Sequence, residues 1–391
     1  MDNSTTDNNG PAAVPPISLN QMDDRRIKKI RPLISPQVFT SVDHSPSRVI
    51  LMEDYPLTEA ALRTISIGRS SAEDIINGRD DRLLVIVGPC SIHDPKSGLE
   101  YAKLLTEYSR QAKQDLHILM RVYFEKPRTT VGWKGLINDP NLDGSFQINK
   151  GLRTARDFLI KCGDLGVPVA VEFLDQISPQ FIADTVSWGA IGARTTESQC
   201  HRELASGLST PVGFKNGTNG SISIAIDAIR AAKSGHVFLS VTKQGISAIV
   251  ETNGNDSCHI ILRGSNSGPN YHAQDIKSCS DQLKTSKLNH RLMVDCSHGN
   301  SSKQHLKQLE VIDSLVEQLG SENSETCDSI MGVMIESNLV EGNQNLEKLG
   351  PSNLVYGKSI TDACLNWEMT RAGLDKLRLG IQKRRQNKLR T

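Results

Sequence analysis

The stretch that decides the fold is Met120-Arg121-Val122-Tyr123-Phe124-Glu125-Lys126-Pro127-Arg128-Thr129-Thr130. Its apolar part, from about Ile118 to Phe124, predicts a buried strand, and a cluster of cations, a proline and two hydroxyls follows at once. Enzymes of the α/β class bring their chemistry to one end of a sheet in this way. Arg121, Lys126 and Arg128 carry the groups that suit phosphate binding. The stretch therefore predicts a strand that delivers cations to an anionic ligand.

The same design recurs along the chain. Eight apolar runs alternate with longer segments of helical period, such as Lys96–Ala112 and Lys303–Leu319. Continuous apolar strands separated by helices indicate a parallel sheet covered by helices. Eight such units predict an α/β fold of the closed (β/α)8 or TIM barrel type, with the active site on the loops after the strands. The runs are Leu83–Val87, Ile118–Phe124, Val167–Phe173, Val186–Gly192, Pro211–Phe214, Val237–Val241, Leu292–Val294 and Gly332–Ile335.

Some segments lie outside this repeat. Two strand-like runs, Ile246–Glu251 and His259–Leu262, flank the turn signal Asn253-Gly254 and predict a β-hairpin inserted after the sixth strand, at about 244–264. Residues 1–20 are predicted to be a disordered tail, residues 21–80 an arm and a helix, and residues 81–391 the catalytic barrel. The basic end of the C-terminal helix, at Lys383-Arg384-Arg385, is interpreted as solvated.

Composition excludes several classes of protein. The 391 residues include 45 Lys plus Arg and 44 Asp plus Glu, so no global charge favours nucleic acid or a membrane surface. No apolar run is long enough for a membrane span, and neither a signal-peptide pattern nor a nucleotide-binding glycine motif is present. Eight scattered cysteines indicate free thiols in a reducing compartment, so a cytoplasmic location is predicted. A Ser91–His298 nucleophile pair is disfavoured because there is no G-x-S-x-G motif.

Two sets of polar residues follow the predicted strands. The first set is cationic, and six cations at one barrel mouth would repel each other unless an anion bound between them. A substrate with two phosphates, or with a phosphate and a carboxylate, is the expected partner. The cations are Arg121, Lys126, Arg128, Arg194, Lys215 and Arg263.

The second set has metal-ligand chemistry. Cys90 ends the first predicted strand, His298 follows the seventh, and Glu336 ends the eighth. These strands are neighbours in a closed barrel, so the three side chains, together with Asp362, could converge. A thiolate, an imidazole and two carboxylates suit Mn²⁺, Fe²⁺, Co²⁺ or Zn²⁺. No compact spacing supports the site, a structural role remains an alternative for each residue, and His93 is a weaker candidate ligand.

Together these motifs resemble those of the type I 3-deoxy-7-phosphoheptulonate (DAHP) synthase family, in its feedback-regulated microbial subgroup. The similarity covers roughly Asp23 to Arg385, and the phenylalanine-sensitive type is the most similar. The motifs are Gly88-Pro89-Cys90-Ser91-Ile92-His93-Asp94, the opening stretch through Thr130, Gly192-Ala193-Arg194-Thr195-Thr196-Glu197-Ser198, Gly213-Phe214-Lys215-Asn216-Gly217-Thr218, Cys296-Ser297-His298-Gly299-Asn300-Ser301 and Ile335-Glu336-Ser337-Asn338.

The resemblance implies a reaction and its residues. Phosphoenolpyruvate would condense with D-erythrose 4-phosphate and water to give DAHP and phosphate, the first step of the shikimate pathway, with Lys126 as the proton donor to the new alkoxide. By resemblance, phosphoenolpyruvate is bound by Arg121, Lys126, Arg194, Lys215 and Arg263, the aldose phosphate by Lys126, Pro127, Arg128 and Thr129, and a divalent metal by Cys90, His298, Glu336 and Asp362. Our hypothesis is that the metal polarises the aldehyde carbonyl or orients the attacking water.

The resemblance also implies regulation by an aromatic amino acid. Phenylalanine is the expected inhibitor and tyrosine the alternative, since a single hydroxyl acceptor can decide between them. A homodimer or homotetramer is expected, because in this family the arm of a neighbouring subunit completes the inhibitor site. The matching positions are Pro168, Ser209, Phe238, Ser240 and Val250, with Asp23 and Asp24 from the arm.

Two other functions fit these residues less well. The eight-carbon 3-deoxy-octulosonate phosphate synthases also condense phosphoenolpyruvate on a barrel, but Lys126-Pro127-Arg128-Thr129-Thr130 is unlike their corresponding motif. A non-catalytic sugar-phosphate sensor would not need the four candidate metal ligands together.

Overall fold

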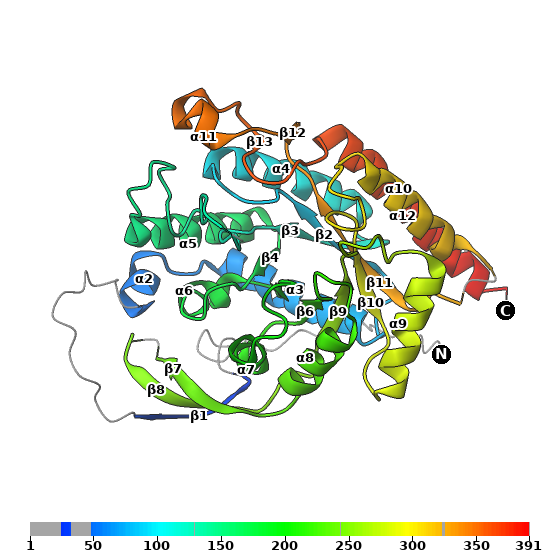
Figure 1. Cartoon of the computed structure of the whole chain (residues 1–391), viewed down its shortest axis with the longest axis horizontal. Coiled ribbons are helices and arrows are strands. Elements are labelled where there is room, and N and C mark those ends of the chain that lie inside the picture. Colours follow the sequence, from blue (N-terminus) through cyan, green and yellow to red (C-terminus); the bar gives the residue numbers. More distant parts are fainter. Residues whose placement is uncertain (1–24, 33–47, 129, 243, 323–324, 391) are drawn as a thin grey trace, which may run out of the picture.

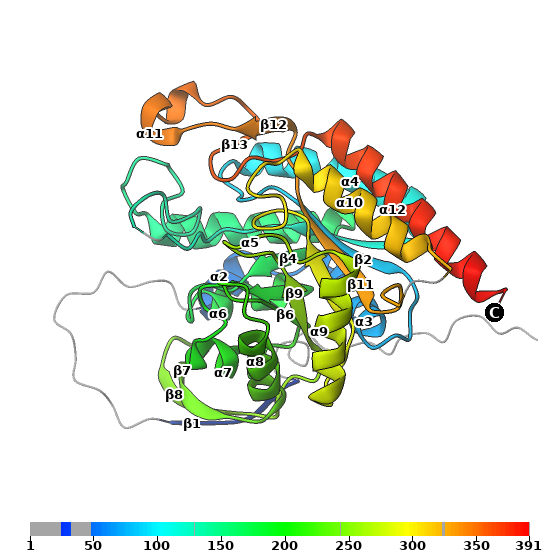
Figure 2. The same ribbon diagram turned by 45° about the vertical axis from the view of Figure 1, so that its right-hand side comes forward.

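The computed structural model describes residues 25–32, 48–128, 130–242, 244–322 and 325–390. Eight parallel strands form a closed barrel in the order β10-β11-β2-β3-β4-β5-β6-β9, which confirms the predicted (β/α)8 barrel. The helices surround this barrel (Figures 1 and 2). The barrel strands are β2 (Leu83–Gly88), β3 (Leu116–Arg121), β4 (Val169–Glu172), β5 (Trp188–Ile191), β6 (Val212–Lys215), β9 (Cys258–Leu262), β10 (Leu292–Asp295) and β11 (Ile330–Glu336).

Side chains alternate between the two faces of each barrel strand, as the period of two requires. In β2, Leu84 and Ile86 join an interior cluster that includes Trp188 of β5 and Met334 of β11. The residues between and beside them pack instead against the surrounding helices. All six β2 residues are therefore buried, which explains why its sequence is a continuous apolar run.

Helices follow the barrel strands on the outside. Within the described residues, none of them is both long and apolar enough to cross a membrane. The short α6 is extended by the 3-10 turn η1 (Ala183–Thr185). The helices are α4 (Pro95–Ala112), α5 (Ile148–Leu165), α6 (Pro179–Ile182), α7 (Gln199–Gly207), α8 (Ser223–Lys233), α9 (Ala273–Thr285), α10 (Lys307–Gly320) and α12 (Trp367–Lys388).

Helix α3 (Glu59–Ile76) closes the amino-terminal end of the barrel. The sequence predicted a helix here, and the Thr58 hydroxyl caps it by accepting a hydrogen bond from the Ala61 amide. Ala72, Ile75 and Ile76 belong to the interior cluster of the barrel. The opposite, carboxyl-terminal end is therefore the end available for an active site. A shorter helix, α2 (Arg48–Asp54), precedes α3.

The prediction of the sixth barrel strand was wrong. The run Val237–Val241 forms β7, which pairs with β8 (Ser247–Thr252) in a separate antiparallel hairpin. The sixth barrel strand is β9, which was predicted to be the second strand of the hairpin. The insertion thus spans 237–252 and precedes the sixth strand instead of following it at 244–264. Exposure alternates along β7, whereas every residue of β9 is buried.

The amino-terminal arm adds the third strand to this hairpin. β1 (Ile27–Pro32) pairs antiparallel with β8, so the small sheet has the order β1-β8-β7 (Figure 1). Arg26 anchors the arm by donating to the carbonyls of Leu208 (2.7 Å) and Thr210 (3.2 Å), just before β6. The predicted tail at residues 1–20 lies outside the described residues.

A long excursion separates β11 from α12. It contains β12 (Val340–Asn343), α11 (Leu346–Leu349), the turn η2 (Pro351–Asn353) and β13 (Lys358–Ser359). β12 and β13 form a two-stranded sheet. The chain then passes Asp362 and enters α12, so this excursion covers one side of the carboxyl-terminal end of the barrel.

The basic end of α12 is only partly solvated: Lys383 is exposed as predicted, but the two arginines after it are not free in solvent. Arg384 is 4% exposed and donates to the carbonyls of Cys327 (3.2 Å), Ile330 (3.3 Å) and Asp81. Arg385 pairs with Asp81 (2.7 Å) and with Asp115 (2.8 Å). These two arginines fasten α12 to the segments that enter β2, β3 and β11, so they are structural.

We expect Arg384→Ala to lower the free energy of unfolding by about 2–3 kcal/mol, because it leaves buried carbonyls without a charged donor. Denaturant unfolding would measure the loss. Arg390→Ala is the matched control, because Arg390 is exposed and pairs only at the surface with Glu322, at 3.0 Å. Its effect should be at most about 1 kcal/mol. Equal effects of the two substitutions would contradict the structural role of Arg384.

Candidate active site

Five barrel strands end in a charged side chain that points into the barrel. In each strand, the residue two positions earlier is an apolar residue or a glycine that faces the barrel interior. Because side chains alternate between the two faces of a strand, the charged side chain also faces the interior. They form one layer, which we call the charged layer, above the apolar interior. All five residues are buried. The charged layer consists of Arg121 (β3), Glu172 (β4), Lys215 (β6), Asp295 (β10) and Glu336 (β11).

Arg121 and Glu336 form a buried ion pair at the centre of this layer. The Arg121 Nη2 lies 2.9 Å from the Glu336 Oε1, and the two side chains are 1% and 0% exposed. The other carboxylate oxygen of Glu336 accepts a hydrogen bond from the Ser297 hydroxyl at 2.8 Å. Burial alone would raise the pKa of Glu336, but His298 and Arg121 hold it at about 2. Glu336 is therefore an anion at neutral pH.

Asp295 forms a second buried contact network that the sequence analysis missed. Its Oδ2 accepts from the Lys215 Nζ at 2.9 Å and lies 2.9 Å from the His298 Nδ1. Its Oδ1 accepts from the Ser297 amide at 3.0 Å. Burial opposes its ionised form, but Lys215 and His298 hold the pKa of Asp295 well below its usual range. Asp295 ends an apolar strand, and the same pattern singled out Glu336 as a candidate site residue. Asp295 could therefore have been predicted as a site residue from the sequence.

Lys126 lies beside the candidate metal ligands. Its Nζ donates to the Cys90 carbonyl at 3.1 Å and to the Cys90 Sγ at 3.2 Å. Its backbone amide donates to the Lys134 carbonyl at 2.9 Å, so the loop after β3 folds back on itself. Burial disfavours the ammonium, but the surrounding acidic groups, Cys90 first, hold the pKa of Lys126 above its ordinary value.

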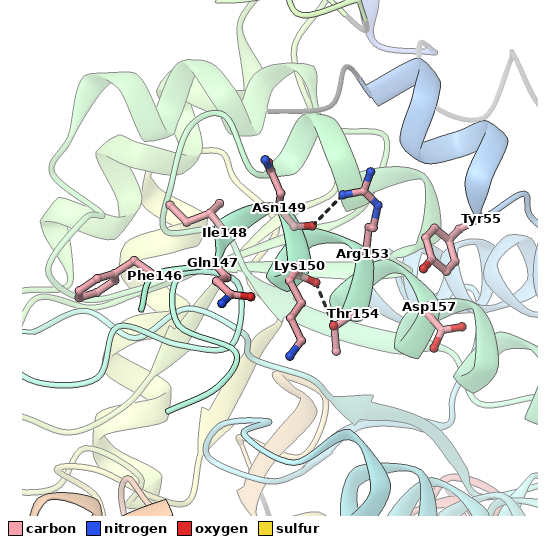
Figure 3. A pocket seen from close by; sticks show the side chains of 9 residues that line it. All are labelled: Tyr55, Phe146, Gln147, Ile148, Asn149, Lys150, Arg153, Thr154 and Asp157. Atoms are coloured by element: carbon pink, nitrogen blue, oxygen red, sulfur yellow. Dashed lines mark hydrogen bonds between the residues drawn. The ribbon is translucent and has the colours of Figure 1, made fainter. Parts of the chain in front are cut away.

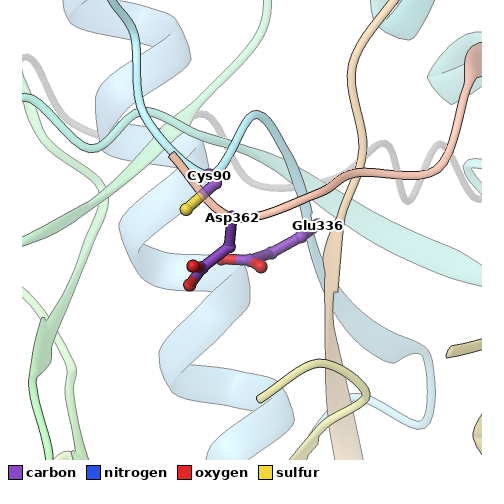
Figure 4. A group of neighbouring side chains, drawn as sticks. All are labelled: Cys90, Glu336 and Asp362. Atoms are coloured by element: carbon purple, nitrogen blue, oxygen red, sulfur yellow. The ribbon is translucent and has the colours of Figure 1, made fainter. Parts of the chain in front are cut away.

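Three of the four predicted metal ligands converge. The ligand atoms of Cys90, Glu336 and Asp362 lie within 4.8 Å of one another, and Figure 4 shows the thiol and the two carboxylates facing the same point. His298 stands beside this group, with its Nε2 3.9 Å from the Glu336 Oε1. His93, the weaker candidate, is not in the group.

The donor set fits a divalent transition metal. The Asp295 Oδ2 lies 2.9 Å from the His298 Nδ1, although without the geometry of a hydrogen bond, and the Nε2 is left available as a ligand. A carboxylate commonly stands behind a metal-binding histidine in this way. The thiol, imidazole and two carboxylates suit Mn²⁺, Fe²⁺, Co²⁺ or Zn²⁺. Burial raises the pKa of the Cys90 thiol, so binding of the metal would be coupled to release of its proton.

All six predicted cations line one cleft of about 190 Å³ at the carboxyl-terminal end of the barrel. Arg121 and Lys215 lie at its buried floor, whereas Arg194 is exposed. Pro127, His298 and Asp362 also line it. The four candidate metal ligands, which we call the metal group, therefore adjoin the same cleft as the cations; they are Cys90, His298, Glu336 and Asp362. Thr129 lies outside the described residues. Three further residues line the cleft that belong to none of the motifs singled out in the sequence, namely Glu172, Lys303 and Thr361.

The chain also has a larger hollow, but its lining residues do not suit a phosphate-bearing substrate or a metal ion. It measures about 730 Å³ and lies at the start of α5, next to Tyr55 (Figure 3). Its two cations are already engaged, because Lys150 donates to the Asn141 amide oxygen at 2.5 Å and Arg153 lies 3.6 Å from Asp54. The smaller cleft is the candidate active site because charges and metal ligands converge there.

The predicted inhibitor residues come from several segments of the fold. Phe238 of β7 pairs with Val250 of β8, and Ser240 lies two residues further along β7. Ser209 lies in the loop that Arg26 anchors. Its buried hydroxyl has no hydrogen-bond partner among the described residues. Pro168 precedes β4 and approaches Gly68 of α3. Asp23 and Asp24 lie outside the described residues.

Fold and site together define a class of protein: a barrel enzyme with a cationic, phosphate-sized cleft and a mixed thiol, imidazole and carboxylate metal group at the carboxyl ends of its strands. The sequence model of the DAHP synthetase I family matches residues 56–375. The chain belongs to this family, and it is a DAHP synthase.

The chain is similar in sequence to known relatives over almost its whole length. The chain is 55% identical over 366 residues to "Phospho-2-dehydro-3-deoxyheptonate aldolase, Phe-sensitive" of Escherichia coli (strain K12), covering 93% of this chain and 99% of the relative. It is 50% identical to the tyrosine-inhibited enzyme of Schizosaccharomyces pombe, covering 94% and 95%. A solved phospho-2-dehydro-3-deoxyheptonate aldolase from Francisella tularensis has a TM-score of 0.85 and 49% identity, covering 89% of this chain and 99% of that one.

We expect Asp295→Asn to weaken divalent metal binding by about 10- to 100-fold, because the amide removes the negative charge behind His298. Equilibrium dialysis with Mn²⁺ or Co²⁺ measures this without turnover. Asp313→Asn is the control, since that carboxylate pairs at the surface with Lys376 at 2.5 Å. Unchanged metal affinity in Asp295→Asn would show that Asp295 does not support the metal site.

Proposed function

We propose that the cleft binds phosphoenolpyruvate and D-erythrose 4-phosphate and condenses them with water to DAHP and phosphate. The observation that carries this proposal is the convergence of six cations and the metal group on one cleft of about 190 Å³. Two phosphates and a carboxylate need several cations, and an aldehyde needs an electrophilic activator. Family membership supports the same pair of substrates.

Phosphoenolpyruvate is assigned to the deep part of the cleft. Arg121 and Lys126, near the metal group, suit its carboxylate, and Lys215 lies on the cleft floor. Arg194 and Arg263 reach the same cleft from the loops after β5 and β9. Burial lowers the pKa of Arg263, and the nearby Arg194 adds to the effect. Two like charges so close together favour a bound anion between them.

Erythrose 4-phosphate is assigned to the side of the cleft near Arg128. Lys126, Pro127 and Arg128 line the cleft there, and Thr129 stays a prediction. A neighbouring hollow of about 500 Å³ shares Arg128, Thr361 and Asp362 with the cleft. The aldose can therefore extend away from phosphoenolpyruvate while its aldehyde end stays near the metal group.

Cys90, His298, Glu336 and Asp362 would hold the divalent ion, which is Mn²⁺, Fe²⁺, Co²⁺ or Zn²⁺. When bound, such an ion supplies Lewis-acid polarisation of a carbonyl oxygen. The residues of the chain orient the reactants around it. Arg121 links substrate binding to metal binding, because its guanidinium lines the substrate cleft and also donates to the candidate metal ligand Glu336.

Lys126 is proposed as the proton donor. The enol carbon of phosphoenolpyruvate attacks the aldehyde carbon, and the aldehyde oxygen becomes an alkoxide that needs a proton. Water adds at the other enol carbon, and phosphate leaves with cleavage of its C–O bond. The Lys126 ammonium lies 3.2 Å from the Cys90 sulfur, so it is beside the ligands near which that oxygen would sit.

Lys126→Met should abolish turnover, by about 10²-fold or more, while the protein still folds and still binds metal. Phosphate release measures turnover, and circular dichroism and dialysis check the fold and the metal. Lys134→Met is the control, because Lys134 lies on the same folded loop with an exposed side chain outside the cleft. Normal turnover in Lys126→Met would exclude the assigned role.

The β1-β8-β7 sheet and the Ser209 loop are proposed as the site of feedback inhibition. The unpartnered Ser209 hydroxyl offers a polar contact, and Phe238, paired with Val250, offers an apolar one. Asp23, Asp24, Pro168 and a neighbouring subunit in a homodimer or homotetramer stay predictions. Phenylalanine is the proposed inhibitor, because the phenylalanine-sensitive relative is 55% identical and the tyrosine-inhibited one 50%.

Titration with each amino acid separately should show inhibition by phenylalanine. Phe238→Ala should abolish that inhibition and keep uninhibited turnover, because Phe238 lies outside the cleft. Leu239→Ala is the matched control, since the adjacent Leu239 is 70% exposed and alternation directs it to the other face of the sheet. Inhibition by tyrosine alone would overturn the choice of phenylalanine.

A further inference from the structure

Lys303 is a cation of the cleft that the reaction described above does not use. It lies in the loop between β10 and α10, and it lines the cleft together with Arg194, Arg263 and His298. Its side chain is exposed. It lies two residues after the strand-end motif Cys296-Ser297-His298-Gly299-Asn300-Ser301, so periodicity alone placed it in a helix.

The cations of the cleft divide into two groups by their partners. Arg121 is paired with Glu336, Lys215 with Asp295, and Lys126 with the thiol of Cys90. Among the residues that the structure describes, Arg194, Arg263 and Lys303 form no ion pair. Several cations that form no ion pair and face one cleft are the expected signature of a site for a dianion. Lys303 belongs to this second group.

The backbone around Lys303 adopts an unfavourable conformation. His298, Ser302 and Lys303 have φ values of 59°, 51° and 58°, and they make up three of the six non-glycine residues with positive φ in the described part of the chain. Left-handed backbone is costly for residues other than glycine. Such strain concentrates where function requires a particular geometry. The Lys303 amide donates to the His298 carbonyl at 2.9 Å and closes the loop.

The same loop is fitted closely to the loop that carries Arg263. The Gly299 amide donates to the Arg263 carbonyl at 3.0 Å. A Cβ atom on Gly299 would come within 2.5 Å of the Ser265 amide nitrogen, so only glycine allows this approach. In the barrel, β10 adjoins β9, whereas β3, which precedes Arg128, is three strands away. Lys303 therefore belongs with Arg263 on the side of the cleft away from Arg128.

We propose that Lys303 binds the phosphate group of phosphoenolpyruvate, together with Arg194 and Arg263, and holds the same phosphate after it leaves. The inference rests on the proposed function, because it assumes that phosphoenolpyruvate occupies this side of the cleft. Lys303 completes a set of three cations from the loops after β5, β9 and β10. Its long, flexible side chain at the rim can follow the phosphate as it departs.

The test is calorimetric binding of phosphoenolpyruvate, and of inorganic phosphate, to the metal-loaded protein without the aldose. Lys303→Gln should weaken both affinities by about tenfold, the loss expected when one charge-assisted hydrogen bond is removed. Lys303→Arg should keep them within about threefold. In turnover, KM for phosphoenolpyruvate should rise and KM for the aldose should stay unchanged.

Two further variants separate binding from folding. Lys307→Gln removes the same charge four residues later, outside the cleft, and should leave both affinities unchanged. Lys303→Gly removes the side chain and also relieves the left-handed backbone, so it should raise the thermal unfolding midpoint while it weakens binding. A structural role for Lys303 would instead lower that midpoint.

The outcomes are distinguishable. The inference would be overturned if Lys303→Gln bound phosphoenolpyruvate with an affinity within twofold of that of the unchanged protein. It would also be overturned if the substitution weakened binding of the aldose instead. Failure of the unchanged protein to bind phosphoenolpyruvate would contradict the proposed function itself.

Discussion

The buried ion pair between Arg121 and Glu336 is the interaction on which the active site depends. Its atoms are 2.9 Å apart and neither side chain is more than 1% exposed. Removal of one partner from such a pair leaves an uncompensated buried charge, at a cost of about 3–5 kcal/mol. The pair therefore fixes both groups in place. Since Arg121 lines the substrate cleft and Glu336 belongs to the metal group, the two halves of the site have one common anchor.

The remaining charges follow from this arrangement. Asp295 has a similar role on β10, the strand next to β11. Its carboxylate contacts both Lys215, which lines the cleft, and His298, a candidate metal ligand. The rigid strand ends thus carry paired charges, whose positions are set before any ligand binds. Cations on the loops, such as Arg194 and Arg263, have no acidic partner among the described residues. The barrel therefore supplies the floor of the site, and its loops supply the charge that an incoming anion neutralises.

Much of this could be predicted from sequence because the physical signals are local. Continuous apolar runs that end in polar residues located seven of the eight barrel strands and the candidate ligands at their ends. The sixth strand was misassigned because short apolar runs look alike whether they are buried on one face or on both. β9 also contains the polar residue His259, whose Nε2 accepts a hydrogen bond from the Trp188 indole at 3.0 Å inside the barrel.

The other errors concern partners that are distant in sequence. Arg384 appeared to be a surface charge, because Asp81 and the carbonyl groups of Cys327 and Ile330 lie 54 to 303 positions away. Asp295 ends an apolar strand as Glu336 does, but its partner Lys215 lies 80 positions earlier in the chain and could not be paired with it from sequence. No periodicity or spacing within a short window reports contacts of this kind. They are set by closure of the barrel, which brings β6 and β10 within reach of the same interior layer.

The most direct test of the account is phosphate release by the protein after removal of divalent metal with a chelator. The account predicts no release from phosphoenolpyruvate and erythrose 4-phosphate in the metal-free protein, and recovery when Mn²⁺ or Co²⁺ is added. It also predicts no release from phosphoenolpyruvate alone, because the aldehyde must accept the enol carbon first. Undiminished release without metal, or release without the aldose, would contradict a metal-dependent condensation in this cleft.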